Sequence, residues 1–334
     1  MKNKRFNYII LFIFTVLVLY FSLKDDFGNV VNNILTMNPL WVIYSVVLMS
    51  LYWIFKAFVI KRYVRKYNKN YSYGKALRLQ METMFFNGIT PFSSGGQPFQ
   101  VLSLKNDGVK GTDGTNIIVL SSFIHQLVLF TLATIAIFSN QFMKLFPPSN
   151  AIRYFSILGY VINILFMAFL LLIMFNKKFD KIVIHFIIKL LNKVRLVKDK
   201  KAVISKWNDY IESLHDGAKL IVKDKKSFIL GYIYTFIGLL GFALVPYTVA
   251  RGMGINTFNV YEALVTIAYV EMIGMFVPVP GGTGGLEYAF TSLFGVFILG
   301  SSVNSVMLVW RFITYYLGII LGGIVLNIRQ RSKQ

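Results

Sequence analysis

The sequence has no cysteine among its 334 residues. Disulfides, thiolate metal sites and catalysis by a thiol are therefore excluded. Its three histidines, His125, His185 and His215, do not share the spacing of a metal-binding motif, so a histidine-based metal centre is not expected. We predict that the protein uses no metal and no cofactor.

Acidic residues are scarce: 14 Asp and Glu stand against 35 Lys and Arg, which gives a net charge of +21. A net charge this strongly positive also occurs in proteins that bind nucleic acid. Here the basic residues lie in loops between apolar segments, and 56% of the residues are hydrophobic. Basic loops on the cytoplasmic side of a membrane, in contact with anionic lipid, explain this pattern. We therefore predict an all-α polytopic membrane protein with no nucleic-acid partner.

Six apolar stretches are long enough to cross a membrane, at residues 6–23, 40–60, 117–139, 154–175, 228–250 and 307–328. The first follows the basic residues MKNKR and lacks a small-residue cleavage site, so we interpret it as an uncleaved span. Residues 176–227 are polar and lysine-rich, with apolar residues at helical spacing in their first part. This pattern predicts a basic amphipathic helical hairpin in the cytoplasm that contacts anionic inner-leaflet lipid over 177–226.

Two further apolar stretches, 82–104 and 257–299, are interrupted by proline and glycine. Each contains the pattern Pro-x-x-x-Gly-Gly, as Pro91, Gly95 and Gly96 and again as Pro280, Gly284 and Gly285. Proline removes a backbone donor and glycine favours turns, so no straight helix is expected through either stretch. Broken backbone at membrane depth is stable only where protein buries it or where it lines a wet cavity. The pattern could recur by chance in a glycine-containing membrane protein. If it is an internal repeat, it predicts two re-entrant hairpins at a transporter site.

The basic region decides how these hairpins lie. If the first broken stretch crossed the membrane once, residues 176–227 would lie outside, against the positive-inside rule. If it enters and leaves from the cytoplasm, both chain termini are cytoplasmic and the second stretch enters from outside. The predicted fold is then six full spans plus two re-entrant hairpins in an inverted-topology repeat, or eight nominal membrane segments. Membrane halves at 1–175 and 228–334 flank the basic region, and the predicted location is the cell membrane.

The segments NGITPFSSGGQPFQVLSLK, PVPGGTGGLE and WRFITYY resemble the membrane domain of the lysylphosphatidylglycerol synthase/flippase family, the multiple peptide resistance factor group. The resemblance covers nearly the whole chain and implies a lipid flippase with a role in lipid metabolism and antimicrobial peptide resistance. Bifunctional members carry their lysyltransferase in a soluble domain that follows the membrane domain. This chain ends at Gln334 directly after its last span, so we expect a stand-alone relative and not an enzyme.

Many relatives show Gly-Glu-x-x-Arg in the first motif, where this chain has Gly96, Gln97 and Gln100. The first motif is therefore neutral here. In the second half, Glu271 precedes the broken turn, where it can serve as a proton or charge relay or bond to backbone freed by the prolines. Arg311 lies within the last span, and an unpaired arginine at the centre of a membrane helix costs about 2.5–3.5 kcal/mol. We predict that Arg311 pairs with Glu287, either permanently or in exchange for a lipid phosphate.

The leading hypothesis is a membrane lipid translocase for an anionic, aminoacylated or polyprenyl-phosphate-linked lipid. Helix starts after the two glycine pairs favour a phosphate, and the predicted substrate-binding residues are Gly95, Gly96, Gln97, Gln100, Gly284, Gly285, Glu287 and Arg311. Two alternatives are a phosphatidylglycerol lysyltransferase or other lipid-modifying transferase, and a non-transporting membrane partner of a separate synthase. No catalytic residue is predicted, because nucleophile-elbow, zinc and phosphate-loop motifs are absent. A homo-oligomer is left open.

Overall fold

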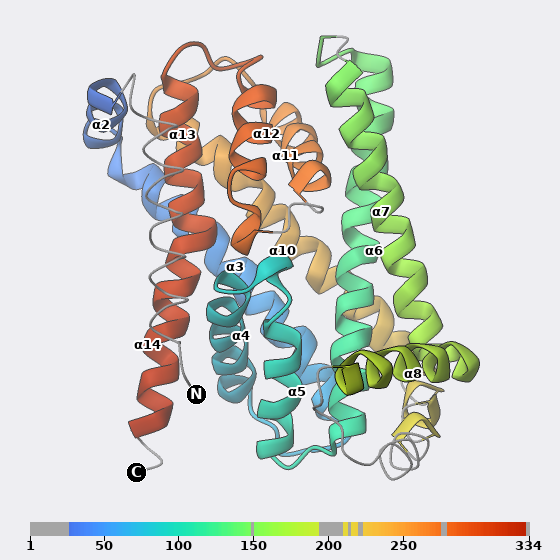
Figure 1. Ribbon diagram of the computed structural model, residues 1–334. Coiled ribbons are helices and arrows are strands. Elements are labelled where there is room, and N and C mark those ends of the chain that lie inside the picture. Colours follow the sequence, from blue (N-terminus) through green and yellow to red (C-terminus); the bar gives the residue numbers. More distant parts are fainter. Residues whose placement is uncertain are drawn as a thin grey trace.

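The computed structural model describes residues 27–147, 150–193, 210–212, 215–219, 223–274 and 279–331. All regular elements in these ranges are helices (Figure 1). The predicted span at 6–23 and most of the second arm of the predicted 176–227 hairpin lie outside the described residues.

Within the described ranges, five helical segments are long and apolar enough to cross a membrane, and they coincide with the other five predicted spans. They are α3 (Pro39–Val64), α6 (Gly111–Met143), α7 (Asn150–Phe175), α10 (Lys225–Gly252) and the pair α13 (Ser302–Arg311) and α14 (Leu317–Arg331). A π-helical turn, η3 (Phe312–Tyr316), joins α13 to α14. A short helix before α3, α2 (Phe27–Leu35), contacts α13, where Asn33 Nδ2 donates to Ser305 Oγ at 3.1 Å.

Small residues bring α3 and α10 close together. A Cβ atom at Gly241 of α10 would lie 2.9 Å from the carbonyl oxygen of Leu48 in α3. Nearby, the hydroxyl groups of Ser45 and Thr248 form a buried hydrogen bond of 2.7 Å between the two helices. Because lipid is as apolar as a protein core, membrane helices associate through such close packing and polar contacts.

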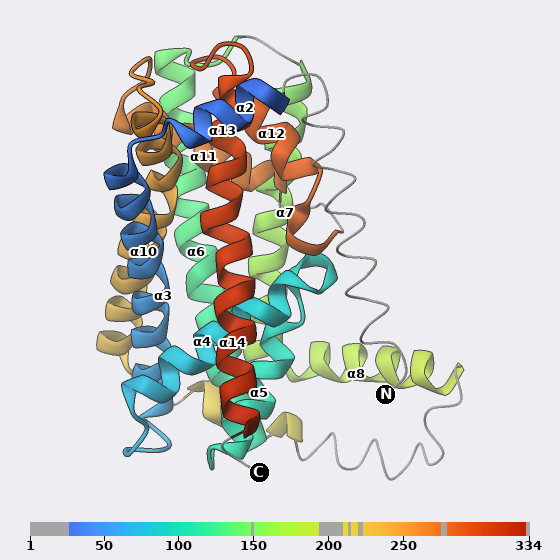
Figure 2. The same ribbon diagram turned by 90° about the vertical axis from the view of Figure 1, so that its left-hand side faces the viewer.

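Two helical hairpins lie between the long helices. The first consists of α4 (Tyr73–Gly88), the turn η1 (Pro91–Ser93) and α5 (Gly96–Asn106). The second consists of α11 (Val260–Gly274), the turn η2 (Pro280–Gly282) and α12 (Gly285–Phe294). Figures 1 and 2 show the first hairpin in the lower half of the bundle and the second in the upper half, with η1 and η2 in contact between them.

The first hairpin starts at Tyr73, earlier than the broken stretch 82–104 recognised in the sequence. The side chain of Ser72 accepts a hydrogen bond from the Lys75 amide and so caps the start of α4. The second hairpin lies within 257–299.

The packing around the two hairpins is reciprocal. Helix α4 contacts α3 and α14, and α11 correspondingly contacts α10 and α6. Helix α5 contacts α6, and α12 contacts α13. If α3, α4, α5 and α6 are exchanged for α10, α11, α12 and α13–α14, each of these contacts maps onto another of them. The contact of α11 with α7 has no counterpart in this exchange.

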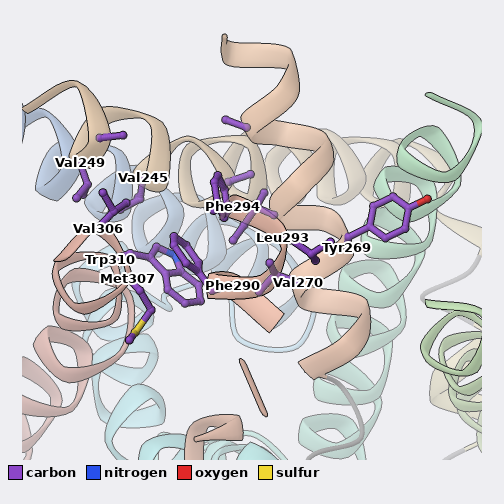
Figure 3. Close-up of a cluster of buried hydrophobic side chains, with 14 of the residues drawn as sticks. Val245, Val249, Tyr269, Val270, Phe290, Leu293, Phe294, Val306, Met307 and Trp310 are labelled. Carbon is purple, nitrogen blue, oxygen red and sulfur yellow. The ribbon is translucent and has the colours of Figure 1, made fainter. Parts of the chain in front are cut away.

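Aromatic packing holds the second hairpin against α13 (Figure 3). The Phe290 ring stacks on Trp310 at 4.6 Å between centroids and on Phe294 at 4.3 Å, and all three side chains are buried. Such pairs add about 0.5–1.5 kcal/mol each to the effect of burying their area. The cluster packs α12 against α13 and thereby also fixes the position of the preceding turn η2.

The lower end of the bundle in Figures 1 and 2 carries α8 (Lys177–Lys193), which runs across the long axis of the other helices. Its Ile182 and Phe186 are exposed, while Asp180 is buried and accepts a 2.7 Å hydrogen bond from His215 Nε2. The end of α3 and the start of α10 lie at this same end and carry Lys61, Arg62, Arg65, Lys66, Lys225 and Lys226.

Asp224 joins α3 and α10 at the basic end. It caps α10 by accepting from the Ser227 amide, and it pairs with Lys66 at 2.9 Å. Hydrogen bonds from Ser227, and the nearby Lys66, hold the pKa of the Asp224 carboxyl well below its usual value. The carboxylate therefore stays charged near neutral pH and keeps both contacts.

Candidate substrate cavity

The two hairpin turns have the same local geometry. The two residues after each proline have positive φ angles, 53° and 51° at Phe92 and Ser93 and 63° and 65° at Gly281 and Gly282. The hydroxyl group three residues after each proline donates to the proline carbonyl at 2.8 Å, from Ser94 in the first turn and Thr283 in the second. The repeated sequence pattern therefore corresponds to a repeated turn.

The glycine pairs of the motif lie at the starts of α5 and α12. The Gly95 amide donates to Thr90 Oγ1 at 2.8 Å, and the Gly96 amide donates to Asn87 Oδ1 at 2.9 Å. In the second turn the Gly284 amide donates to Glu287 Oε2 at 2.5 Å, and α12 begins at Gly285. These three amides are already hydrogen-bonded within the protein, so the phosphate attraction expected from free amides does not apply to them.

Close packing explains the first glycine pair better than a special backbone conformation. Gly95 has an ordinary φ of −75°, but a Cβ atom there would lie 2.5 Å from the Thr90 methyl carbon. A Cβ atom at Gly96 would overlap the Asn87 side chain. In the second pair, Gly284 has a φ of 91°, which favours glycine.

Arg311 pairs with Glu287, which confirms the partner predicted from the sequence. Arg311 Nε donates to Glu287 Oε1 at 2.6 Å, and its Nη2 donates to the Gly281 carbonyl at 2.8 Å. Both side chains are buried, with 4% of Arg311 and 6% of Glu287 exposed. The guanidinium also lies 4.7 Å from the centroid of the Tyr315 ring, whose hydroxyl donates to the Gly88 carbonyl at 2.7 Å. Arg311 and Tyr315 thus fix the second turn and connect it to the first hairpin.

Alanine at Gly281 is expected to destabilise the protein by about 2–5 kcal/mol. A non-glycine residue with positive φ costs about 1–2 kcal/mol, and overpacking adds about 1–3 kcal/mol; here the new Cβ atom would overlap the Tyr315 ring. Gly74, near the start of α4, has open space around its Cβ position. Gly74→Ala is the matched control and should unfold at or above the wild-type temperature. Equal melting temperatures for the two variants in detergent would contradict the role assigned to the turn.

A central cavity of about 590 Å³ lies between the two turns and the surrounding long helices. Residues of both turns line it, together with side chains from α3, α6, α7 and α10. Its polar lining side chains include Lys56, Asn87, Gln97, His125, Gln126 and Glu271. A polar cavity of this kind within a membrane bundle is a candidate path or binding site for a substrate.

A second, almost wholly apolar pocket of about 180 Å³ lies between α6, α7, α10 and α11. Glu271 lines both this pocket and the central cavity. Its carboxylate has no ion-pair partner within 4.0 Å in the described part of the chain. Glu271 therefore lies where polar and apolar surroundings meet.

The predicted site residues fall into two groups. Gln97 and Glu271 line the central cavity, and Gln100 lines a smaller pocket beside it. The remaining ones support the hairpin turns and are absent from the cavity lining: Gly95, Gly96, Gly284, Gly285, Glu287 and Arg311. Sequence reasoning missed Lys56 and His125, which line both the cavity and the smaller pocket.

A second buried ion pair, between Glu82 and Arg329, was also not predicted from the sequence. Arg329 of α14 donates to Glu82 Oε2 at 2.8 Å and to Ser103 Oγ at 2.8 Å, and Glu82 is fully buried. The pair joins both arms of the first hairpin to α14, as Arg311 joins the second hairpin to α13. A buried carboxylate in a broken membrane segment needs a partner, but the sequence does not indicate which distant cation supplies it.

The fold and the cavity define an α-helical multi-pass membrane protein with a polar site between two broken helical hairpins. Residues 8–322 match the family described as the lysylphosphatidylglycerol synthase TM region, and the chain belongs to this family. It is also similar to a UPF0104 membrane protein of Archaeoglobus fulgidus, with 24% identity over 294 residues that cover 87% of each chain.

Proposed function

We propose that this protein is a flippase-like translocase for a membrane lipid that is anionic, aminoacylated or linked to a polyprenyl phosphate. The central cavity carries the proposal, because it offers polar side chains between the two hairpin turns and adjoins an apolar pocket at Glu271. A lipid needs both environments when its head group crosses the membrane interior while its chains stay in apolar surroundings.

We infer that the two halves form an inverted-topology repeat with two re-entrant hairpins. The matching turns and the reciprocal packing around them support this inference. With the stretch at 6–23 as a further span, the chain would have six full spans. Two opposed hairpins with contacting tips suit alternating access, since movement of one hairpin against the other would open the cavity to either side.

The basic end of the bundle is assigned to the cytoplasm of a cell membrane, with both chain termini on that side. Basic residues are concentrated there on α3, α10 and α8. Segments rich in Lys and Arg stay preferentially on the cytoplasmic side of a membrane. The exposed apolar residues of α8 would enter the inner leaflet while its lysines contact anionic lipid, in keeping with the region 177–226 predicted to do so.

Within the cavity, Gln97 and Gln100 would donate hydrogen bonds to the head group, and Glu271 would contact a cationic part of it or carry a proton. Glu287, Arg311 and the glycine pairs would maintain the two turns. Exchange of Glu287 for a lipid phosphate at Arg311 would require η2 to open, because three acceptors now surround the guanidinium.

The proposal is tested with purified protein in liposomes that contain fluorescent lipids with different head groups. The protein is expected to make inner-leaflet lipid of at least one phosphate-containing class accessible to an impermeant quencher. Gln97→Trp, which fills part of the cavity, should slow this movement. Leu102→Trp is the matched control on α5, because Leu102 is exposed and lies outside the cavity lining. No lipid movement above that of protein-free liposomes would contradict the proposal.

Two further measurements test the alternatives. Lysylated phosphatidylglycerol formed from lysyl-tRNA would identify a lysyltransferase. Stable co-purification of a synthase, with unchanged lipid distribution in cells that lack this chain, would identify a non-transporting partner.

A further inference from the structure

We propose that the small polar pocket beside the central cavity is the subsite for the lipid phosphate, with Lys56 as its cation. This inference rests on the proposed function and specifies which part of the cavity holds the anionic group. The pocket measures about 110 Å³ and lies between α3, α4, α5 and α6. It shares Lys56, Asn87, Gln97 and His125 with the central cavity, so a group bound in it remains connected to the rest of the head group.

The chemistry of the pocket favours an anion. Among the described residues, its lining includes hydrogen-bond donors but no Asp or Glu; the polar lining side chains are Lys56, Gln80, Thr83, Asn87, Gln97, Gln100, Ser121, Ser122, His125, Gln126 and Thr235. By contrast, Glu271 lines the central cavity and not this pocket. A negatively charged group would therefore meet a cation and neutral donors here without a repelling charge.

Several of these groups lack a partner. Gln80 is only 2% exposed, and its Nε2 has no hydrogen-bond acceptor among the described residues. Ser121 Oγ and His125 Nδ1 also have no hydrogen-bond partner among the described residues, and Nδ1 is a donor in the tautomer that carries its proton there. A buried polar atom left unpaired costs about 1–3 kcal/mol. Phosphate oxygens can accept several hydrogen bonds at once, so a bound phosphate would satisfy these atoms together.

Lys56 differs from Arg311 and Arg329 in its surroundings. It lies eight residues before the end of α3 at Val64, which corresponds to about 12 Å along the helix. Arg311 and Arg329 each have a glutamate partner, but Lys56 has no carboxylate within 4.0 Å in the described residues. Its Nζ lies 5.4 Å from the centroid of the Tyr52 ring. An ionisable residue within a membrane bundle is a candidate functional residue, and the positive charge of Lys56 would attract an anionic group into this pocket.

The test measures binding, separately from transport. Purified protein is titrated with dihexanoyl phosphatidylglycerol, with dihexanoylglycerol, which lacks the phosphate, and with inorganic phosphate, and the melting temperature is followed. The wild type should be stabilised by the phospholipid and not by the diacylglycerol. Lys56→Met should weaken the phospholipid effect by about 10- to 100-fold, the scale of a lost charge-assisted hydrogen bond. Lys56→Arg should retain most of it.

Arg65→Gln is the control, since this exposed arginine at the end of α3 lies outside the pocket and should leave binding unchanged. If Lys56→Met does not fold, Ser121→Ala serves instead, because it removes one oxygen atom and should weaken phospholipid binding alone. Full phospholipid binding by Lys56→Met, or by Ser121→Ala in that case, would overturn the subsite. Equal stabilisation by inorganic phosphate would mean that the site takes free phosphate and not a lipid.

Failure of the subsite and failure of the proposed function give different results. Normal lipid movement by Lys56→Met would overturn the subsite and leave the translocase in place. Phospholipid binding that requires Lys56, in a protein that moves no lipid, would support the subsite and contradict the translocase.

Discussion

Arg311→Met is expected to destabilise the fold by about 3–5 kcal/mol, because it leaves a buried carboxylate without its cation. The Glu287 carboxylate is 2.6 Å from Arg311 Nε, and the substitution also removes the donor to the Gly281 carbonyl. Arg311→Lys should be destabilised as well, since one ammonium group cannot reproduce the two directed contacts of a guanidinium. The measurement is the midpoint of thermal unfolding in detergent, compared with the wild type.

The double variant Arg311→Met with Glu287→Gln removes both charges and is expected to recover most of the lost stability. If the pair only holds the turn, this variant should also move lipid, and we expect this result because Arg311 is surrounded by protein acceptors. A double variant that folds but moves no lipid would instead support exchange of Glu287 for a lipid phosphate. A double variant less stable than Arg311→Met would contradict the ion-pair explanation itself.

Features that depend on residue types close together in the chain could be predicted from the sequence. Five spans followed from the length of apolar stretches, and the two turns followed from proline and glycine within such stretches. The Arg311–Glu287 pair followed because a buried arginine needs a nearby carboxylate and few were available. The left-handed conformation of Phe92 and Ser93 could not be predicted from residue type, since neither is glycine.

Features that depend on how helices distant in the sequence pack together could not be predicted from the sequence. Lys56 and His125 come from different helices, and only the packing of α3 against α4 and α6 places them on one pocket. The Glu82–Arg329 pair joins residues that are 247 positions apart in the chain. Hydrophobic periodicity identifies the helices but not which of their polar residues face each other.

We predict that the two hairpins enter the membrane from opposite sides. The most direct test is to find on which side of the membrane each of four single cysteines is accessible. The chain has no cysteine of its own, so each substitution introduces the only thiol. Asn70 and Lys110 flank the first hairpin, and Thr257 and Leu299 flank the second; all four are exposed. Cysteines at these positions are probed in intact cells with an impermeant maleimide, before and after permeabilisation.

Cysteines at positions 70 and 110 should react only after permeabilisation, and those at positions 257 and 299 should react in intact cells. This result requires each hairpin to enter and leave the membrane on one side, with the basic end inside. Labelling of positions 70 and 110 from opposite sides of the membrane would show that the first hairpin crosses it, and would contradict the inverted repeat.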